Sequence, residues 1–124
     1  MTPQEEYELG LACFKGENGH EKDYDKAFLH FQNAAQHDNP EALNKLGVCH
    51  FNGFGTPKNY EKALELLQKA ASLGCASALY NLGVTYDNGQ GVAQDYAEAA
   101  KWYRKAAEQG EAYAREALER IKNK

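Results

Sequence analysis

Little in this sequence of 124 residues is typical of a disulfide-stabilised or membrane-spanning protein. It has three cysteines, Cys13, Cys49 and Cys75, and an odd number at irregular spacing argues against a disulfide framework. We expect free thiols packed in a reducing compartment, and therefore a cytoplasmic protein. No run of eighteen apolar residues is present, so no transmembrane helix is predicted. The N-terminus has no basic segment followed by an apolar one, so we expect no signal peptide.

Residue patterns that build catalytic or metal sites are also missing. The four histidines form no HExxH motif and no paired Cys/His spacing. We therefore predict a protein that is not an enzyme and that uses no cofactor or metal. One alternative stays open, in which His50, Cys13 or Cys49 serves a metal- or thiol-dependent enzyme.

Clustered lysine and arginine residues are absent as well. The formal net charge is −4, and residues 1–40 hold eight acidic and three basic residues. This balance argues against nucleic acid as a partner, because binding phosphates requires clustered basic side chains. It favours a basic partner near the N-terminal end. The alternative is a solvated acidic surface that only aids solubility.

What the sequence does contain is one pattern repeated three times, at intervals of about 36 residues. The repeated positions hold Leu-Gly pairs, tyrosines, alanines and alanine doublets. They are Leu9-Gly10, Leu46-Gly47 and Leu82-Gly83; Tyr24, Tyr60 and Tyr96; Ala27, Ala63 and Ala99; and Ala34-Ala35, Ala70-Ala71 and Ala106-Ala107. A period in this range is typical of stacked supersecondary units, and such stacks usually bind other proteins.

Each repeat has the pattern of two antiparallel helices. In the third repeat, apolar and small residues at three- and four-residue steps predict a helix over 76–87, and glycines then break it. Asp95 is the predicted N-cap of the second helix, and Gly110 ends that helix. Asp23 and Asn59 are the corresponding caps in the earlier repeats, and Asn39 caps the first helix of the second repeat.

These signals predict an all-α fold, an α-α superhelix of seven helices in a single domain spanning residues 1–124. The repeats cover approximately residues 3–38, 40–74 and 76–110. A final helix over 112–122, apolar on one side and charged on the other, would cap the stack. In the interior, Gly47, Gly83 and the alanine doublets would let helix backbones approach closely, while large aromatic side chains fill the space between pairs.

The third repeat resembles the Sel-one-like repeat, a relative of the tetratricopeptide repeat. The resemblance rests on a Leu-Gly core, a glycine-containing loop and a Tyr-Ala-Trp-Tyr helix. Its residues are Ala78, Leu82, Gly83, Tyr86, Gly89, Gly91, Asp95, Tyr96, Ala99, Trp102, Tyr103, Lys105, Ala106, Ala107 and Gly110. The second repeat departs at His50 and Leu66, and the first at Cys13 and His30. The resemblance covers essentially the whole chain.

The resemblance implies a right-handed α-solenoid with a role in protein–protein interaction, as an adaptor or scaffold. In stacks of this kind the first helix of each pair lines the concave side. By register, that side would present nine candidate partner-binding residues. They are Tyr7, Leu11, Phe14, Asn44, Val48, Phe51, Tyr80, Val84 and Asp87. Phe14 and Phe51 have two open interpretations, an apolar floor for a peptide or packing under the loops.

The leading hypothesis is therefore a non-catalytic module that binds a partner protein or peptide in a concave groove. The alternative is a dedicated inhibitor or immunity protein for a toxin. We expect no nucleic-acid or membrane partner, and either a monomer or a weak homo-oligomer.

Overall fold

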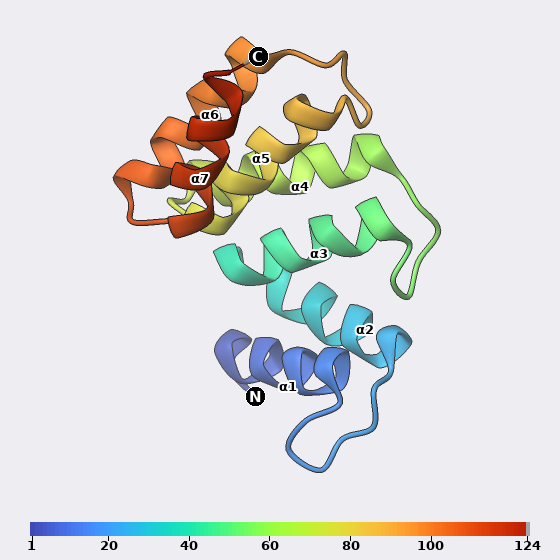
Figure 1. The fold of residues 1–124 in the computed structure, drawn as a ribbon. Coiled ribbons are helices and arrows are strands. Elements are labelled where there is room, and N and C mark those ends of the chain that lie inside the picture. The colour runs from blue at the N-terminus through green and yellow to red at the C-terminus, as the bar shows by residue number, and fades with distance from the viewer. Residues whose placement is uncertain (124) are drawn as a thin grey trace.

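The computed structural model describes residues 1–123, and these form seven α-helices and no β-strand. The helices are α1 (Pro3–Lys15), α2 (Tyr24–Ala35), α3 (Pro40–Asn52), α4 (Tyr60–Ser72), α5 (Ala76–Asn88), α6 (Tyr96–Glu108) and α7 (Ala112–Ile121). They stack as antiparallel pairs, with the N-terminus at one end of the stack and α6 and α7 at the other (Figure 1). The predicted all-α superhelix is confirmed.

The helices begin where side chains can bind the unpaired N–H groups of the first turn. Asp23, Asn39, Asn59 and Asp95 each accept a hydrogen bond from the backbone N–H three residues later, at 2.9–3.1 Å. All four caps agree with the sequence predictions. Thr2 adds a reciprocal capping box with Glu5 at the start of α1.

The turns between repeats require a left-handed backbone conformation at one residue. Gly74 and Gly110 take φ values of 88° at this position. In the first repeat the same position is Asp38, which adopts φ 55°. Aspartate tolerates this conformation better than most residues with a side chain, so the turn is kept without a glycine.

Small residues allow the two helices of a pair to pack at close range. A Cβ placed on Gly83 of α5 would lie 2.4 Å from Cδ1 of Tyr103 on α6, which is closer than atoms can approach. Tyr103 can therefore lie flat against α5, and its side chain is fully buried. Phe31, Leu67 and Leu82 are the other large side chains with almost no exposure, and they form the core between the helices.

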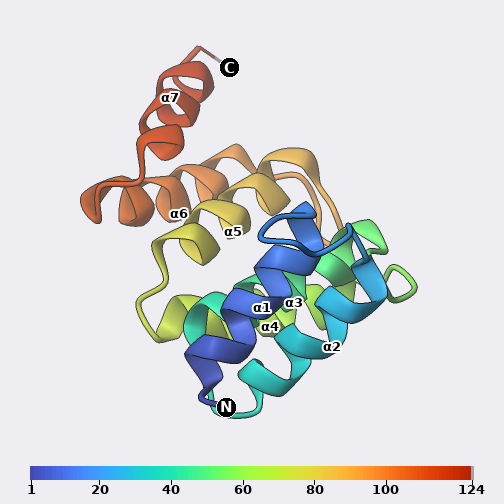
Figure 2. The ribbon, with the colours of Figure 1, turned by 90° about the horizontal axis from the view of Figure 1, so that it is seen from below.

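The final helix, α7, packs on α6 at the C-terminal end of the stack. Seen from below, α7 projects from the body that the other helices form (Figure 2). It packs on α6 through the buried Ala114 and Ala117. Within residues 1–123, no helix combines the length and the apolar character that crossing a lipid bilayer requires.

Candidate functional site

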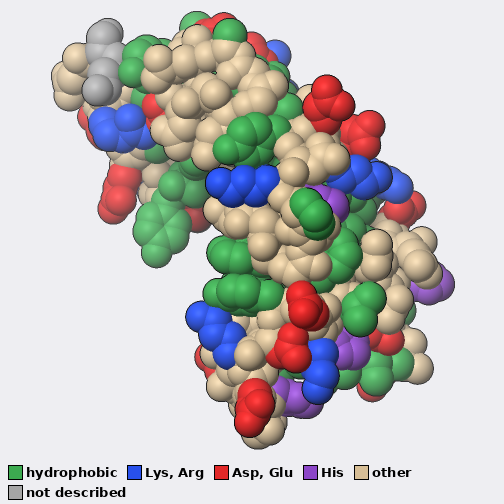
Figure 3. Space-filling model, turned by 90° about the vertical axis from the view of Figure 1, so that its right-hand side faces the viewer, with side chains coloured by type: hydrophobic (Ala, Val, Ile, Leu, Met, Phe, Trp, Pro, Cys, Tyr) green, Lys and Arg blue, Asp and Glu red, His purple; other side chains and the backbone are tan. Residues whose placement is uncertain are grey.

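One side of the stack carries two adjoining hollows. The first, of about 320 Å³, is lined by residues of α1, α3, α5 and the start of α7: Tyr7, Glu41, Asn44, Lys45, Val48, Cys75, Ser77, Tyr80, Asn81, Glu111 and Tyr113. The second, of about 280 Å³, is lined by Val48, Phe51, Asn52, Asn81, Val84, Thr85, Asn88 and Gln90. Because the two hollows share Val48 and Asn81, we treat them as one continuous inner groove. Figure 3 shows the molecule hollowed along one edge, with hydrophobic side chains on both sides.

The repeat register brings side chains of different helices into this groove. Tyr7, Asn44 and Tyr80 hold the same position in the first helices of successive repeats, so they lie in a row across α1, α3 and α5. The ring of Tyr7 packs on Phe31, with 5.8 Å between centroids. The ring of Tyr80 lies 6.1 Å from that of Tyr113 on α7. The aromatic residues therefore stand at both ends of the row, with an amide between them.

That amide belongs to a pair of asparagines at the centre of the groove. Asn81 donates from Nδ2 to Oδ1 of Asn44 at 2.9 Å. Asn44 is only 5% exposed, so a polar side chain is held nearly buried in the wall of the groove. Among the described residues, neither side chain makes another hydrogen bond. The pair thus keeps free amide donors and a free carbonyl acceptor that are accessible from the groove.

Two carboxylates lie beside the tyrosines at this end of the groove. Burial raises the pKa of Tyr7 to about 12, and the nearby Glu41 adds to the effect. Burial also raises the pKa of Tyr80, with a further contribution from Glu111. Glu111 caps α7 by accepting from the N–H of Ala114 at 3.0 Å. Both tyrosines therefore stay neutral hydrogen-bond donors at neutral pH.

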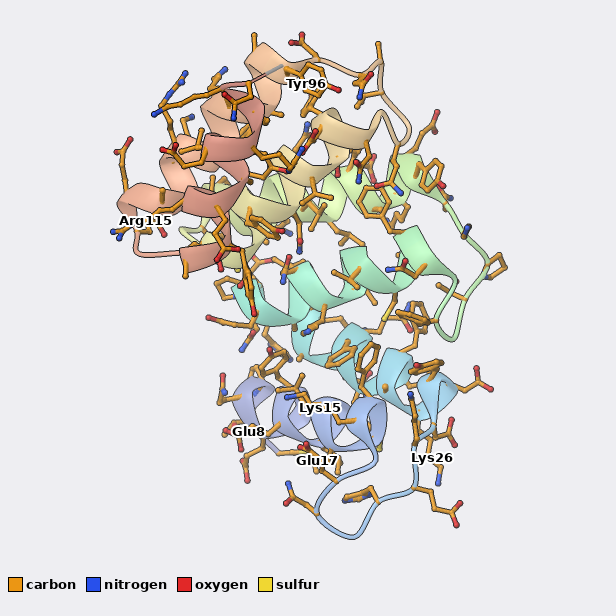
Figure 4. The ribbon with its side chains drawn as sticks, viewed as in Figure 1. Glu8, Lys15, Glu17, Lys26, Tyr96 and Arg115 are labelled. Carbon is orange, nitrogen blue, oxygen red and sulfur yellow. The ribbon has the colours of Figure 1, made fainter. Side chains whose placement is uncertain are left out.

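A positive charge lies on the opposite side of the same hollow. Burial lowers the pKa of Lys45, and the neighbouring Lys15 lowers it further. The Nζ atom of Lys45 lies 5.6 Å from the centroid of the Phe14 ring. Figure 4 shows Lys15 on the side of α1 that faces α3. No carboxylate within residues 1–123 lies at ion-pair distance from Lys45.

Six of the nine sequence-predicted site residues line the inner groove. They are Tyr7, Asn44, Val48, Phe51, Tyr80 and Val84. Leu11 and Phe14 lie outside both hollows and pack against the core. The ring of Phe14 contacts Tyr24, Phe31 and Phe54, with centroids 5.1, 6.1 and 5.4 Å away. This position corresponds to packing under the loops, one of its two interpretations.

Asp87 is the predicted groove residue that the structure removes from the site. Its side chain is 5% exposed, and it accepts a hydrogen bond of 2.9 Å from the hydroxyl of Tyr103. It also pairs with the guanidinium of Arg120 on α7. The register placed Asp87 beside Phe14 and Phe51, but the capping helix covers this position in the third repeat. Asp87 therefore joins α5, α6 and α7 and lies outside both hollows.

Tyr113 and Glu111 complete the tyrosine-lined end and are not among the nine residues predicted from the sequence. Tyr113 stands 36 residues after Ser77, so extending the register by one repeat would have found it. The sequence predicts α7 as a cap, and a cap contributes no position to the groove. Its side chain is 66% exposed and contacts Tyr80 alone among the aromatic rings.

The thiols named for the alternative enzyme are enclosed in the core. All three cysteines are free and buried. Burial raises the pKa of Cys49 to about 11, so its thiol stays protonated and weakly nucleophilic at neutral pH. Within the described part of the chain, no group of three His, Cys, Asp or Glu side chains could hold a metal ion.

Comparisons with known proteins agree with the geometry. The Sel1 repeat family matches residues 6–39, 40–75 and 76–111. A Sel1 repeat protein from Oxalobacter formigenes superposes with a TM-score of 0.87 at 31% identity, over 94% of this chain and 47% of that protein. A protective antigen of uropathogenic Escherichia coli strains, with an SLR fold, superposes with a TM-score of 0.82 at 36% identity. The match covers 90% of this chain and 24% of that protein.

A third structure supports the fold alone. Helicobacter pylori cysteine rich protein B superposes with a TM-score of 0.75 at 24% identity, over 94% of this chain and 89% of that protein. This chain spans about half of the first of these structures and about a quarter of the second. No curated protein matches the sequence.

Proposed function

Because this chain belongs to the Sel1 repeat family, we propose that it is a non-catalytic module that holds a partner protein in the inner groove, as an adaptor or scaffold. The Sel1 repeat fold is generally a protein–protein interaction scaffold. The observation that carries the proposal is the composition of the groove. Tyrosines, valines and a phenylalanine from different helices meet there beside amides with unused hydrogen-bonding groups. Tyrosine anchors with nearby polar groups are typical of interaction hot spots.

The proposal has three further features, which concern the cellular compartment, the role of the partner and the oligomeric state. Three buried free thiols suit a reducing compartment, so we place the protein in the cytoplasm. Inhibition of a toxin would use the same groove as an adaptor role, and it differs only in what the partner does. We propose a monomer or a weak homo-oligomer, with the groove left open for a different protein.

A pair of serine substitutions tests the groove. Ser77 is exposed in the wall of the first hollow, and Ser72 is exposed on α4, at a separate hollow between α4 and α6. Ser77→Arg places a long cationic side chain in the groove, and Ser72→Arg makes the same change elsewhere. Affinity capture from cell extract, quantified by mass spectrometry, should show partners that Ser77→Arg reduces tenfold or more and Ser72→Arg leaves unchanged.

Both variants must first show the circular dichroism and melting temperature of the natural protein. Equal capture by the two folded variants would contradict a partner site in the inner groove.

A further inference from the structure

The tyrosine-lined end of the inner groove has the chemistry of a site for a cationic side chain. Tyr7, Tyr80 and Tyr113 come from α1, α5 and α7 and line the same hollow. Aromatic faces attract a lysine or arginine side chain within about 6 Å of the ring centroid. The 66% exposure of Tyr113 leaves one ring open to an incoming group.

Carboxylates supply the matching charge. Glu41 is exposed in the wall of the hollow, and no basic group within the described residues lies at ion-pair distance from it. Glu111 lies in the same wall and uses one carboxylate oxygen to cap α7. The ammonium of Lys45 is drawn away from this end, over the ring of Phe14. Arg120, whose charge also acts on Tyr80, is paired with Asp87. The two glutamates therefore supply the charge that attracts a basic side chain.

The asparagine pair next to the tyrosines suits an extended backbone. Asn44 is more than nine-tenths buried, and its Nδ2 group is unpaired among the described residues. The Oδ1 atom of Asn81 is an unpaired acceptor beside it. A peptide unit offers one C=O and one N–H, which match these two groups. A helical segment satisfies its own backbone groups, so it would leave this asparagine pair unused.

From these three observations we infer that the inner groove binds an extended segment of a partner protein, with a lysine or arginine side chain between the tyrosines and its backbone across Asn44 and Asn81. This inference rests on the proposed function, because it names the chemistry of the partner at the same groove. An acidic segment bound through Lys45 and Lys15 is the opposite outcome, and the experiment separates the two.

The experiment begins with random dodecapeptides displayed on phage and selected on the full chain. We expect enriched sequences to share a lysine or arginine. A synthetic, fluorescein-labelled copy of the tightest one is then titrated with the protein in a fluorescence anisotropy assay. The Tyr80→Ala substitution should raise the Kd of this peptide about tenfold or more, and this result would place the bound peptide in the inner groove.

The charge is tested by a matched pair of glutamates. Glu41→Gln removes a carboxylate of the groove, and Glu61→Gln removes one from the same first-turn region of the outer helix α4. We expect Glu41→Gln to raise the Kd about fivefold and Glu61→Gln to leave it unchanged. Replacing the basic residue of the peptide by norleucine should weaken binding to the natural protein by about the same factor. The same norleucine replacement should have little further effect on the affinity of the Glu41→Gln variant.

The backbone contact is tested by N-methylation of successive peptide amides. One methylated position should abolish binding, and Asn81→Leu should make binding insensitive to methylation there. Two outcomes would overturn the inference and leave the proposed function of the groove intact. In the first, the peptides lose affinity with Tyr80→Ala but are acidic. In the second, they lose affinity with Tyr80→Ala, but neither Glu41→Gln nor N-methylation changes their affinity. Peptides whose affinity Tyr80→Ala does not change, or a library with no enriched sequence, would overturn both the inference and the proposed function.

Discussion

At the scale of single residues, the repeated Leu-Gly pair sets how closely two helices approach. The same glycine position meets different neighbours in successive repeats. A Cβ on Gly83 would lie 2.4 Å from a carbon of the Tyr103 ring, which is held in place by burial. A Cβ on Gly47 would lie 3.1 Å from the end of the Leu67 side chain. The tolerance for a methyl group therefore differs between equivalent positions.

We predict that Gly83→Ala destabilises the protein more than Gly47→Ala. Both changes improve helix propensity by about 1 kcal/mol, so the difference between them reports the steric clash. Gly83→Ala should lower the free energy of unfolding by about 1–3 kcal/mol through overpacking against Tyr103. Urea titrations of the two variants measure this difference. Equal stability of the variants would contradict the close packing of α5 on α6.

His50 is a second residue whose surroundings decide its behaviour. Its Nδ1 atom is buried, with no hydrogen-bond partner in the described residues, and its ring meets that of Phe28 edge to face at 5.6 Å. Burial lowers the pKa of His50 from its ordinary value of 6.5, and the charge of Lys62 lowers it further. The folded protein therefore resists protonation at this position more than the unfolded chain does.

The sign of the pH effect follows from this difference. The contribution of His50 to stability is present above pH 6.5 and is lost as the pH falls toward the lower pKa of the folded state. We predict that His50→Tyr, which introduces the residue found at Tyr86 in the next repeat, reduces the loss of stability between pH 7.5 and 5.5. Urea titrations at both pH values provide the measurement. His37→Tyr, at an exposed position, should retain the pH dependence of the natural protein, and a similar loss in all three proteins would exclude His50 as its source.

At the scale of the elements, the loops join one repeat to the next. Phe54, in the loop after α3, packs its ring 4.5 Å from Tyr24 at the start of α2. The backbone of Gly55 also approaches the same helix, where a Cβ would lie 2.4 Å from the carbonyl oxygen of Tyr24. Phe14 completes this cluster from α1. The second glycine of the loop is therefore needed for stacking as well as for turning.

We predict that Phe14→Ala lowers the free energy of unfolding by about 2–3 kcal/mol, because its ring contacts three others. Phe51→Ala should cost less, about 1–2 kcal/mol, since its nearest ring is Tyr60 at 5.5 Å and one side of it faces the groove. Chemical denaturation gives both values. A Phe14→Ala variant as stable as the natural protein would show that Phe14 is not needed for packing and is available to a partner.

At the scale of the whole molecule, a buried polar contact fixes α7 on the rest of the stack. Glu119 stands where Gly47 and Gly83 occur in the repeats, so a further helix could not approach α7 as Tyr103 approaches α5. The buried Asp87 then fixes α7 by binding Tyr103 and Arg120. Burial raises the pKa of Tyr103, the hydrogen bond to Asp87 raises it further, and the charge of Arg120 opposes both effects.

We predict that Asp87→Ala lowers the free energy of unfolding by about 2–4 kcal/mol, because it leaves a buried tyrosine hydroxyl and an arginine without this acceptor. In the Asp87→Ala variant, amide hydrogen exchange should accelerate more in α7 than in α3, relative to the natural protein. Glu119→Ala breaks only an exposed pair with Lys122 and should change stability by less than about 0.5 kcal/mol. Unchanged protection of α7 in Asp87→Ala would show that its docking depends on other contacts.

The sequence by itself determined the helices and their order. Helix starts depend on caps such as Asn39 and Asp95, and the pairing of helices depends on small residues at fixed spacing. Both features are therefore encoded by residues within each repeat. For the same reason the register placed Tyr7, Asn44 and Tyr80 correctly on one side of the stack. Local signals of this kind are repeated three times, which makes them readable without any long-range contact.

Only the tertiary structure decided which side chains on that side remain open. Asp87 and Phe14 hold groove positions by register, but α7 covers the first and the loop after α3 covers the second. Tyr113 joins the groove because α7 packs beside α5, and Asn81 because its amide reaches Asn44 on the neighbouring helix. These outcomes depend on how successive repeats rotate against one another, a geometry that the pattern within one repeat does not contain.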